Sequence, residues 1–80
     1  MALGRVLRRH RKRRRWSQET LAFEANMDRN YVSLIELGRN SPSVRMLFRL
    51  CAALEVSASD LLKEVDKEMH SSTATDQGLM

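Results

Sequence analysis

The chain has 80 residues, 42% of them hydrophobic, a formal net charge of +4 and a single cysteine. This length allows one small core, and the lone cysteine excludes an internal disulfide. Because the apolar runs are short, we expect neither a signal peptide nor a membrane span. With two histidines and no clustered carboxylates, the chain offers no nucleophile–base set and no metal site, so we expect neither an enzyme nor a cofactor. The scarcity of strand-type runs predicts an all-α fold, and we expect a cytoplasmic, nucleoid-associated protein.

The charges are distributed unevenly along the chain. Residues 1–15 carry eight arginines and lysines and no acid, whereas residues 55–80 carry two lysines against six acids. A strongly basic end implies an anionic partner, and nucleic acid is the commonest one. The alternatives are a solvated face that keeps the protein soluble and a chance match to a nuclear-localisation signal.

The first predicted helix runs from about Leu3 to Arg14, because Leu3, Leu7 and His10 recur at helical spacing. These three residues mark its buried edge, where we expect His10 to be hydrogen-bonded. The other faces carry seven arginines and lysines. Their repulsion costs about 0.2–0.5 kcal/mol per i, i+4 pair. We expect phosphates to offset this repulsion, and assign that role to three residues at the end of the run, Arg13, Arg14 and Arg15.

Two short helices are predicted next, at about residues 17–25 and 28–37. Ser17 and Asp28 can each cap the helix that they precede, and Asn26 can take the left-handed conformation that ends the first of them. A connection of only two residues requires the second helix to turn sharply across the first. This pattern is typical of a helix-turn-helix, with an ordinary helical hairpin in a small bundle as the alternative.

The helix at 28–37 is the predicted recognition helix of this unit. Val32 and Ile35 are expected to face the core, and the opposite face presents a base-reading set, namely Arg29, Asn30, Ser33 and Leu34. Arginine can bond guanine, asparagine can bond adenine, and an apolar side chain can touch the thymine methyl group. Contacts to backbone phosphates are assigned to Gln18, Tyr31 and Arg39, with edge packing as the alternative for Tyr31. Glu36 is the one acid near this surface, and Arg11 is its candidate partner.

Ser43 can cap a fourth helix, predicted at about residues 43–54, with a core stripe formed by Val44, Leu47, Leu50, Cys51 and Leu54. A capping box at residues 57–60 predicts a fifth, short helix. The later residues lack periodicity. We therefore predict a helix-turn-helix domain at residues 1–67 and a flexible tail at residues 68–80.

Residues 3 to about 62 resemble the XRE family of helix-turn-helix proteins, which includes the lambda-type phage repressors. They are most similar to its small single-domain members, such as restriction–modification controller proteins. The resemblance is carried by Leu3, Leu7, Arg8 and Arg11 and by the segments SQETLA (17–22), YVSLIELGRNSPS (31–43) and LCAALEVSASDLL (50–62). It implies a five-helix, lambda-repressor-like fold that binds double-stranded DNA as a homodimer, with the recognition helix in the major groove. It further implies that Gln18 and the base-reading set meet DNA, and that Arg11 and Glu36 form a salt bridge.

The chain departs from the family pattern in its turns and in its recognition helix. The family often has glycine where this chain has Arg15, Asn26 and Glu55. Only asparagine takes a left-handed conformation readily, so Arg15 and Glu55 would each cost about 1 kcal/mol unless the turns differ. Leu34 replaces a residue that is usually polar, which weighs against hydrogen-bonded base reading there.

The sequence therefore predicts a transcriptional regulator that binds a pseudo-palindromic operator as a homodimer, with half-sites about 34–36 Å apart. The predicted dimer interface comprises Val56, Ala58, Leu61 and Leu62, with Met46 or Phe48 contributing. These residues could instead only complete the core, as we expect Leu61 to do in any case. No small-molecule ligand is expected, so regulation would act through protein concentration, cooperative binding or contact with RNA polymerase.

Two other functions stay open. An antitoxin-type or other interaction module would bind a protein through the exposed leucines or the tail, with DNA binding secondary. An RNA-binding protein would use the arginine-rich helix, but four aromatic residues in 80 provide few stacking surfaces.

Overall fold

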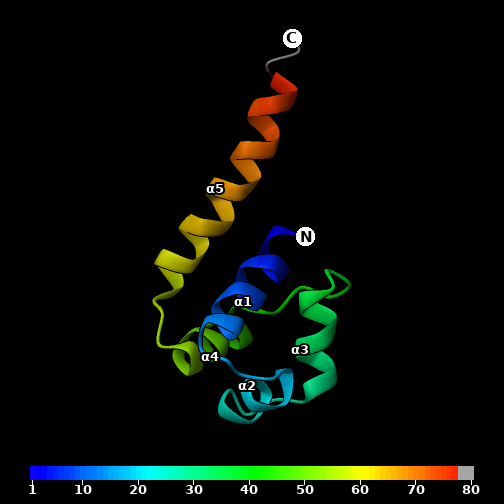
Figure 1. Cartoon of the computed structure of the whole chain (residues 1–80), viewed down its shortest axis with the longest axis vertical. Helices are drawn as coiled ribbons and strands as arrows, with labels where there is room; N and C mark the ends of the chain where they lie inside the picture. The colour runs from blue at the N-terminus through cyan, green and yellow to red at the C-terminus, as the bar shows by residue number, and fades with distance from the viewer. Residues whose placement is uncertain (78–80) are drawn as a thin grey trace.

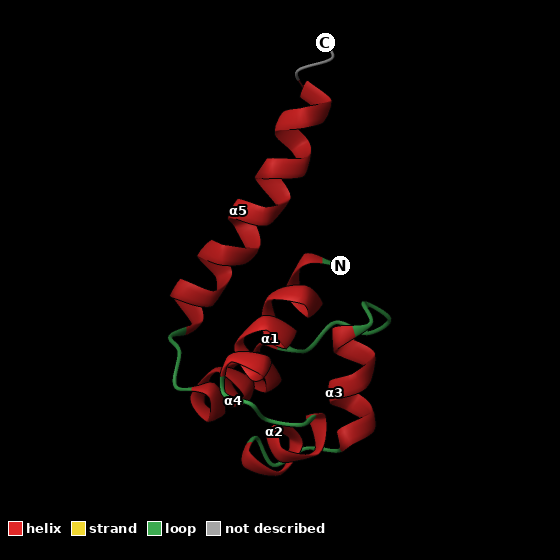
Figure 2. Cartoon of the chain, viewed as in Figure 1, coloured by secondary structure: helices red, strands yellow, loops and turns green. Residues whose placement is uncertain are grey.

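The structure is a computed structural model that describes the backbone of residues 1–77 and the side chains of residues 1–70. Within this part of the chain there are five helices and no strand (Figure 2). In chain order, the helices are α1 (Ala2–Arg13), α2 (Gln18–Glu24), α3 (Arg29–Glu36), α4 (Val44–Leu54) and α5 (Ala58–Gln77). The predicted all-α fold is confirmed.

The longest helix, α5, differs most from the prediction. The sequence predicts a short fifth helix and a tail from residue 68, whereas the helix has 20 residues and ends at Gln77. Figure 1 shows the first part of α5 beside α1 and its last turns extending past the N terminus, away from the other helices. A helical segment without a neighbouring helix needs no apolar stripe, so periodicity could not reveal it. Residues 78–80 lie outside the described residues.

The core lies between α1–α4 and the start of α5. All five helices contribute to its large, fully buried side chains, which are Val6, Leu7, Leu21, Val32, Ile35, Leu50 and Leu61. One core prediction is wrong. Val44 is 68% exposed, since the buried part of α4 is its C-terminal half. Leu3 is partly buried against the core, and Val6, which the spacing did not single out, is fully buried. Cys51 belongs to this core, where burial raises the pKa of its thiol.

Side-chain caps define where the helices after α1 begin, as the sequence predicts. The hydroxyl oxygens of Ser17, Ser43 and Ser57 each accept a bond at 3.0–3.2 Å from the backbone N–H three residues later. The Asp28 carboxylate accepts from the backbone N–H of Asn30 at 2.7 Å. Because such a cap stabilises a helix by about 1 kcal/mol, these bonds matter most for α2 and α3, which are only 7 and 8 residues long.

Three turns contain a non-glycine residue in the left-handed conformation. Arg15, Asn26 and Glu55 have φ angles of 60°, 56° and 56°. The turns therefore keep the backbone conformation that glycine favours. The arginine and the glutamate each carry strain of about 1 kcal/mol, whereas asparagine tolerates this conformation better.

Gly4 allows α1 to approach α3 closely. A Cβ atom at this position would lie 2.7 Å from the carbonyl oxygen of Glu36 and closer still to that of Ile35. Since no other side chain fits there, Gly4 sets the distance between α1 and the C-terminal end of α3. The sequence pattern carries no signal for this role, because the two carbonyl groups lie far along the chain.

Candidate nucleic-acid interface

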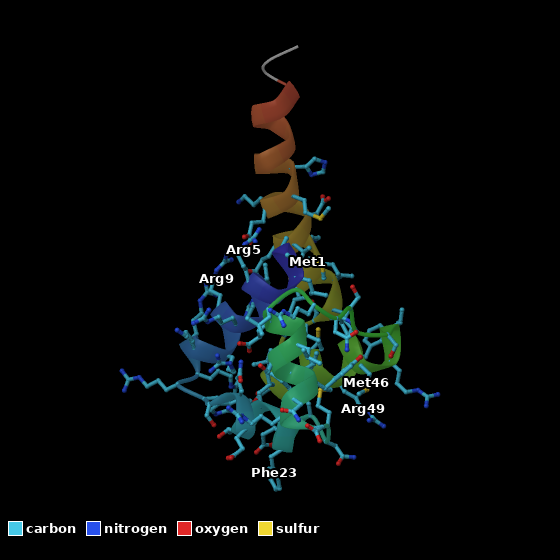
Figure 3. The ribbon with its side chains drawn as sticks, turned by 90° about the vertical axis from the view of Figure 1, so that its right-hand side faces the viewer. Met1, Arg5, Arg9, Phe23, Met46 and Arg49 are labelled. Atoms are coloured by element: carbon cyan, nitrogen blue, oxygen red, sulfur yellow. The ribbon has the colours of Figure 1, made fainter. Side chains whose placement is uncertain are left out.

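The third helix lies on one face of the molecule and faces the viewer in Figure 3. Its inner side is anchored by Val32 and Ile35, which are 2% and 1% exposed. The four predicted base-reading residues are distributed over the rest of the helix. Arg29 and Asn30 are exposed in its first turn, Leu34 is 37% exposed one turn later, and Ser33 is partly buried. The first turn of α3 thus presents a charged group and an amide to any ligand on this face.

The C-terminal end of α3 is joined to α1 by a buried ion pair. Arg11 Nε lies 2.7 Å from Glu36 Oε2, and Arg11 Nη2 lies 3.0 Å from Glu36 Oε1. The two side chains are only 10% and 4% exposed. Arg11 also donates from Nη1 to the backbone carbonyl oxygen of Trp16 at 2.7 Å. The ion pair predicted between these residues is present, and its two parallel bonds hold α3 in one orientation relative to α1.

The same carboxylate binds Gln18. Gln18 Nε2 donates to Glu36 Oε1 at 3.1 Å, so the start of α2 is joined to the end of α3. The sequence analysis predicts a phosphate contact for Gln18 and does not predict its bond to Glu36. One N–H of the amide is used by it, and the second N–H can still reach a phosphate oxygen.

The arginines on one side of α1 are neutralised inside the chain, and His10 beside them is hydrogen-bonded as predicted. Arg5 Nε lies 2.7 Å from Glu68, Arg9 lies 3.2 Å from Glu68 and 3.6 Å from Glu64, and His10 Nε2 lies 2.6 Å from Glu64. The hydrogen bond from Arg5, together with the charges of Arg5 and Arg9, lowers the pKa of Glu68. The expectation that phosphates offset the whole repulsion on α1 is therefore wrong for these residues. Carboxylates of α5 offset it, because α5 is long enough to lie along α1.

Arg14 is also used inside the protein. Its guanidinium group donates to the backbone carbonyl of Leu54 at 2.9 Å and to the Glu55 carboxylate at 3.0 Å, and it lies 4.6 Å from the centroid of the Trp16 ring. These contacts join the end of α1 to the end of α4. We therefore remove Arg14 from the predicted phosphate-binding residues.

The other predicted phosphate-binding residues are not engaged in this way. Among the side chains that the structure describes, Arg13, Arg15 and Arg39 make no ion pair and are exposed. Arg39 follows α3 directly, and its backbone N–H closes the end of that helix on the Leu34 carbonyl at 2.9 Å. Tyr31 is partly buried and packs against the core. Arg39 thus follows the C-terminal end of α3 and Tyr31 lies within this helix, whereas Arg13 ends α1 and Arg15 follows it.

The residues predicted to form a dimer interface do not form one exposed surface. Leu61 is 0% exposed, so its predicted place in the core is confirmed and its predicted contact with a partner is wrong. Val56 and Ala58 are partly buried, and Leu62 is 45% exposed. The larger exposed apolar side chains nearby in the chain are those of Val44 and Phe48 on α4, at 68% and 58%. The sequence analysis missed the exposure of Val44 because Val44 continues the apolar spacing of the buried half of α4.

Two capped helices joined by a left-handed turn, the second with polar side chains on its outer face, define a helix-turn-helix DNA-binding domain. The helix-turn-helix family HTH_3 matches residues 7–61. The chain belongs to this family of XRE-type proteins. Among the described residues, no helix has the length and apolar character needed to cross a membrane.

Known proteins of this type are similar to much of the chain. The HTH-type transcriptional regulator SlrR of Bacillus subtilis is 40% identical over 60 residues, which cover 74% of this chain and 40% of SlrR. The restriction-modification controller protein C.AhdI from Aeromonas hydrophila has a TM-score of 0.73 at 37% identity, over 75% of this chain and 91% of that one. The clp gene regulator ClgR from Corynebacterium glutamicum has a TM-score of 0.86 at 32% identity, over 95% of this chain and 81% of that one. The chain thus spans less than half the length of SlrR.

Proposed function

We propose that this protein is a transcriptional regulator that binds double-stranded DNA sequence-specifically, with α3 in the major groove. The observation that carries the proposal is the α3 surface. Its inner residues are buried in the core, its first turn exposes Arg29 and Asn30, and the buried Arg11–Glu36 pair fixes its orientation. A helix held rigidly with polar groups outward is what base reading in the major groove requires.

Within this proposal, Arg29 and Asn30 read base edges. A good bidentate contact of this kind discriminates by about 1–3 kcal/mol against the wrong base. Leu34 lies one turn further along and would contact a thymine methyl group rather than accept or donate a hydrogen bond. Ser33 is partly buried, so only part of its side chain is available for base contacts beside the other base-reading residues.

Phosphate contacts on both sides of α3 complete the interface. Tyr31 lies on α3 itself, Gln18 is bonded to Glu36 at the C-terminal end of α3, Arg39 follows that end, and Arg13 is the last residue of α1. These groups would fix the position of the protein on the duplex and supply affinity that falls with salt.

We further propose that two chains bind a pseudo-palindromic operator as a homodimer. Val44 and Phe48 are one helical turn apart on α4, and both are more than half exposed. Together with Leu62, and with Val56 and Ala58 at its margin, they form the proposed dimer surface. A helix-turn-helix domain of this size offers few base contacts, so a second copy doubles the site, with half-sites about 34–36 Å apart. Contact with RNA polymerase stays a prediction.

Selection from a pool of random duplexes tests the DNA-binding proposal. We expect a palindromic consensus that the protein binds at least about a thousandfold more tightly than a scrambled duplex at physiological salt. Asn30→Ala and Arg29→Ala should each relax the preference at one position of each half-site. Equal weakening on every sequence would assign these residues to phosphates, and the absence of any consensus, or equal binding to an RNA hairpin, would contradict the proposal.

Sedimentation equilibrium tests the dimer surface with a matched pair of variants. Phe48→Glu should weaken the dimer by at least tenfold, because it places a charge in the proposed interface. Phe23→Glu is the control, since Phe23 is even more exposed, at 82%, but lies on α2 at the opposite end of the molecule from the free part of α5 (Figure 3). Equal effects of the two variants, or a monomeric wild-type protein on its operator, would contradict the homodimer.

A further inference from the structure

We propose that Arg8, Lys12 and Arg15 form a second DNA-contacting surface, which binds phosphates of the duplex that flanks each half-site. The three residues, called the outer row below, recur at i, i+4 and i+7 along α1 and the turn after it. This inference rests on the proposed function, because it presumes that α3 occupies the major groove. It extends the contacted DNA beyond the recognition helix.

The outer row belongs to the part of the basic run that the fold leaves uncompensated, as Arg13 also does. On α1, Arg5 and Arg9 pair with carboxylates of α5, and Arg11 pairs with Glu36. Arg8, Lys12 and Arg15 are exposed, and none of them pairs with a carboxylate among the described side chains. Like charges at this spacing repel each other. The fold therefore neutralises the neighbouring row and leaves this one for an external anion.

Arg15 supplies a second, independent observation. Its φ angle of 60° is a conformation that glycine would adopt without strain. No described contact of the Arg15 side chain compensates for this strain. A strained arginine without an internal partner points to a partner outside the chain.

The position of the outer row is set rigidly relative to α3. Gly4 lies against the carbonyl oxygens of Ile35 and Glu36, and Arg8 follows Gly4 by one turn of α1. The Arg11–Glu36 pair holds the same two helices together further along. The outer row therefore runs beside α3 at a fixed distance from it, so a duplex bound at α3 could extend over it.

Helix α1, which carries Arg8 and Lys12, lies on the side of α3 that faces away from the proposed partner. In Figure 3, Arg5 and Arg9 of α1 lie on one side of α3, and Met46 and Arg49 of α4 lie on the other. The proposed dimer surface includes α4, so α1 would lie at the outer end of each half-site. Arg8 and Lys12 are about 6 Å apart along the axis of α1, Arg15 follows in the turn after the helix, and one DNA strand carries a phosphate about every 3.4 Å of duplex axis. The spacing suits two or three phosphates of the flanking duplex.

Two duplexes that differ only in length test this inference. Both carry the selected operator, one with about two base pairs outside each half-site and the other with about twelve of arbitrary sequence. The triple variant Arg8→Gln, Lys12→Gln, Arg15→Gln removes the outer row. Its matched control is Arg5→Gln, Arg9→Gln, which removes charge from the same helix at residues that α5 already neutralises.

We expect the wild-type protein to bind the long duplex at least tenfold more tightly than the short one at low salt, and the triple variant to lose this difference. The salt dependence on the long duplex should fall by about 0.9 in log–log slope for each phosphate that the variant no longer neutralises. The control should keep most of the difference. Equal weakening on both duplexes, or no weakening on either, overturns the inference, with circular dichroism confirming that the variants are folded. Specific binding of the short duplex by the wild-type protein would leave the proposed function intact in either case.

Discussion

Two junctions of α1 both pair arginine with glutamate, but they differ in burial. At the junction with α3, the side chains of Arg11 and Glu36 are 10% and 4% exposed. At the junction with α5, those of Arg5 and Glu68 are 56% and 25% exposed. Water screens an exposed pair and leaves it little net stabilisation, whereas a buried pair cannot lose one member without leaving an uncompensated charge. The same two residue types thus fix the recognition helix at one junction and only neutralise charge at the other.

Removing one carboxylate from each junction should give the largest difference in the free energy of unfolding between the two junctions. Glu36→Ala leaves the buried Arg11 guanidinium without its partner, so we expect a loss of about 3–5 kcal/mol in the free energy of unfolding. Urea denaturation followed by circular dichroism measures it. Glu68→Ala is the matched control and should change the urea midpoint far less. If Glu36→Ala does not fold, Glu36→Gln keeps one hydrogen-bond acceptor and makes the loss measurable. Similar effects at the two junctions would contradict the role of burial.

The close approach of α1 and α3 provides the next test. Gly4→Ala places a Cβ atom against two backbone carbonyl oxygens, and backbone cannot move aside as a flexible side chain can. We expect a loss of about 1–3 kcal/mol, as for other overpacked sites, and weaker DNA binding because α3 is displaced. Arg8→Ala, an exposed substitution on the same helix, should change stability by less than about 0.5 kcal/mol. A stabilised Gly4→Ala protein would show that the two helices separate easily.

Glycine substitutions in the turns that follow α1 and α4 should stabilise the protein, whereas the substitutions above destabilise it. Arg15→Gly and Glu55→Gly relieve a left-handed conformation, and each should stabilise the protein by about 1 kcal/mol, read from the thermal midpoint. Asn26→Gly should stabilise the protein less, because asparagine tolerates this conformation. Glu55→Gly also loses the exposed bond to Arg14, so its gain should be smaller than that of Arg15→Gly. No gain at either position would mean that the strain is relieved elsewhere.

The smallest effect is expected from pH and salt at the α5 junction. Arg5 and Arg9 lower the pKa of Glu68 in the folded protein, so the contribution of this residue to stability is present above its unfolded pKa, near 4.5. It is lost as the pH falls through the lower, folded pKa. The stability difference between the wild-type protein and Glu68→Gln should therefore shrink below about pH 4 and also in 1 M salt. A difference that persists in high salt would indicate packing instead of charge.

Much of the local structure could be predicted from the sequence because its causes are local. Ser17 and Asp28 cap the helices directly after them, and Asn26 takes the left-handed conformation between these helices. Val32 and Ile35 are buried because their spacing matches the period of a helix packed on one side. These features require only neighbours within a few residues, and all of them were predicted.

The sequence by itself determined the five-helix class, the capped helix-turn-helix and the residues on the outer face of α3, because capping, turn conformation and apolar period act over a few residues. Only the tertiary structure decided which arginines of α1 are neutralised, how closely α1 approaches α3, and how far α5 extends. These outcomes depend on contacts between residues far apart in the chain, such as Arg5 with Glu68 and Gly4 with Glu36. A charge or a glycine looks the same in the sequence whether its partner is another helix, solvent or DNA.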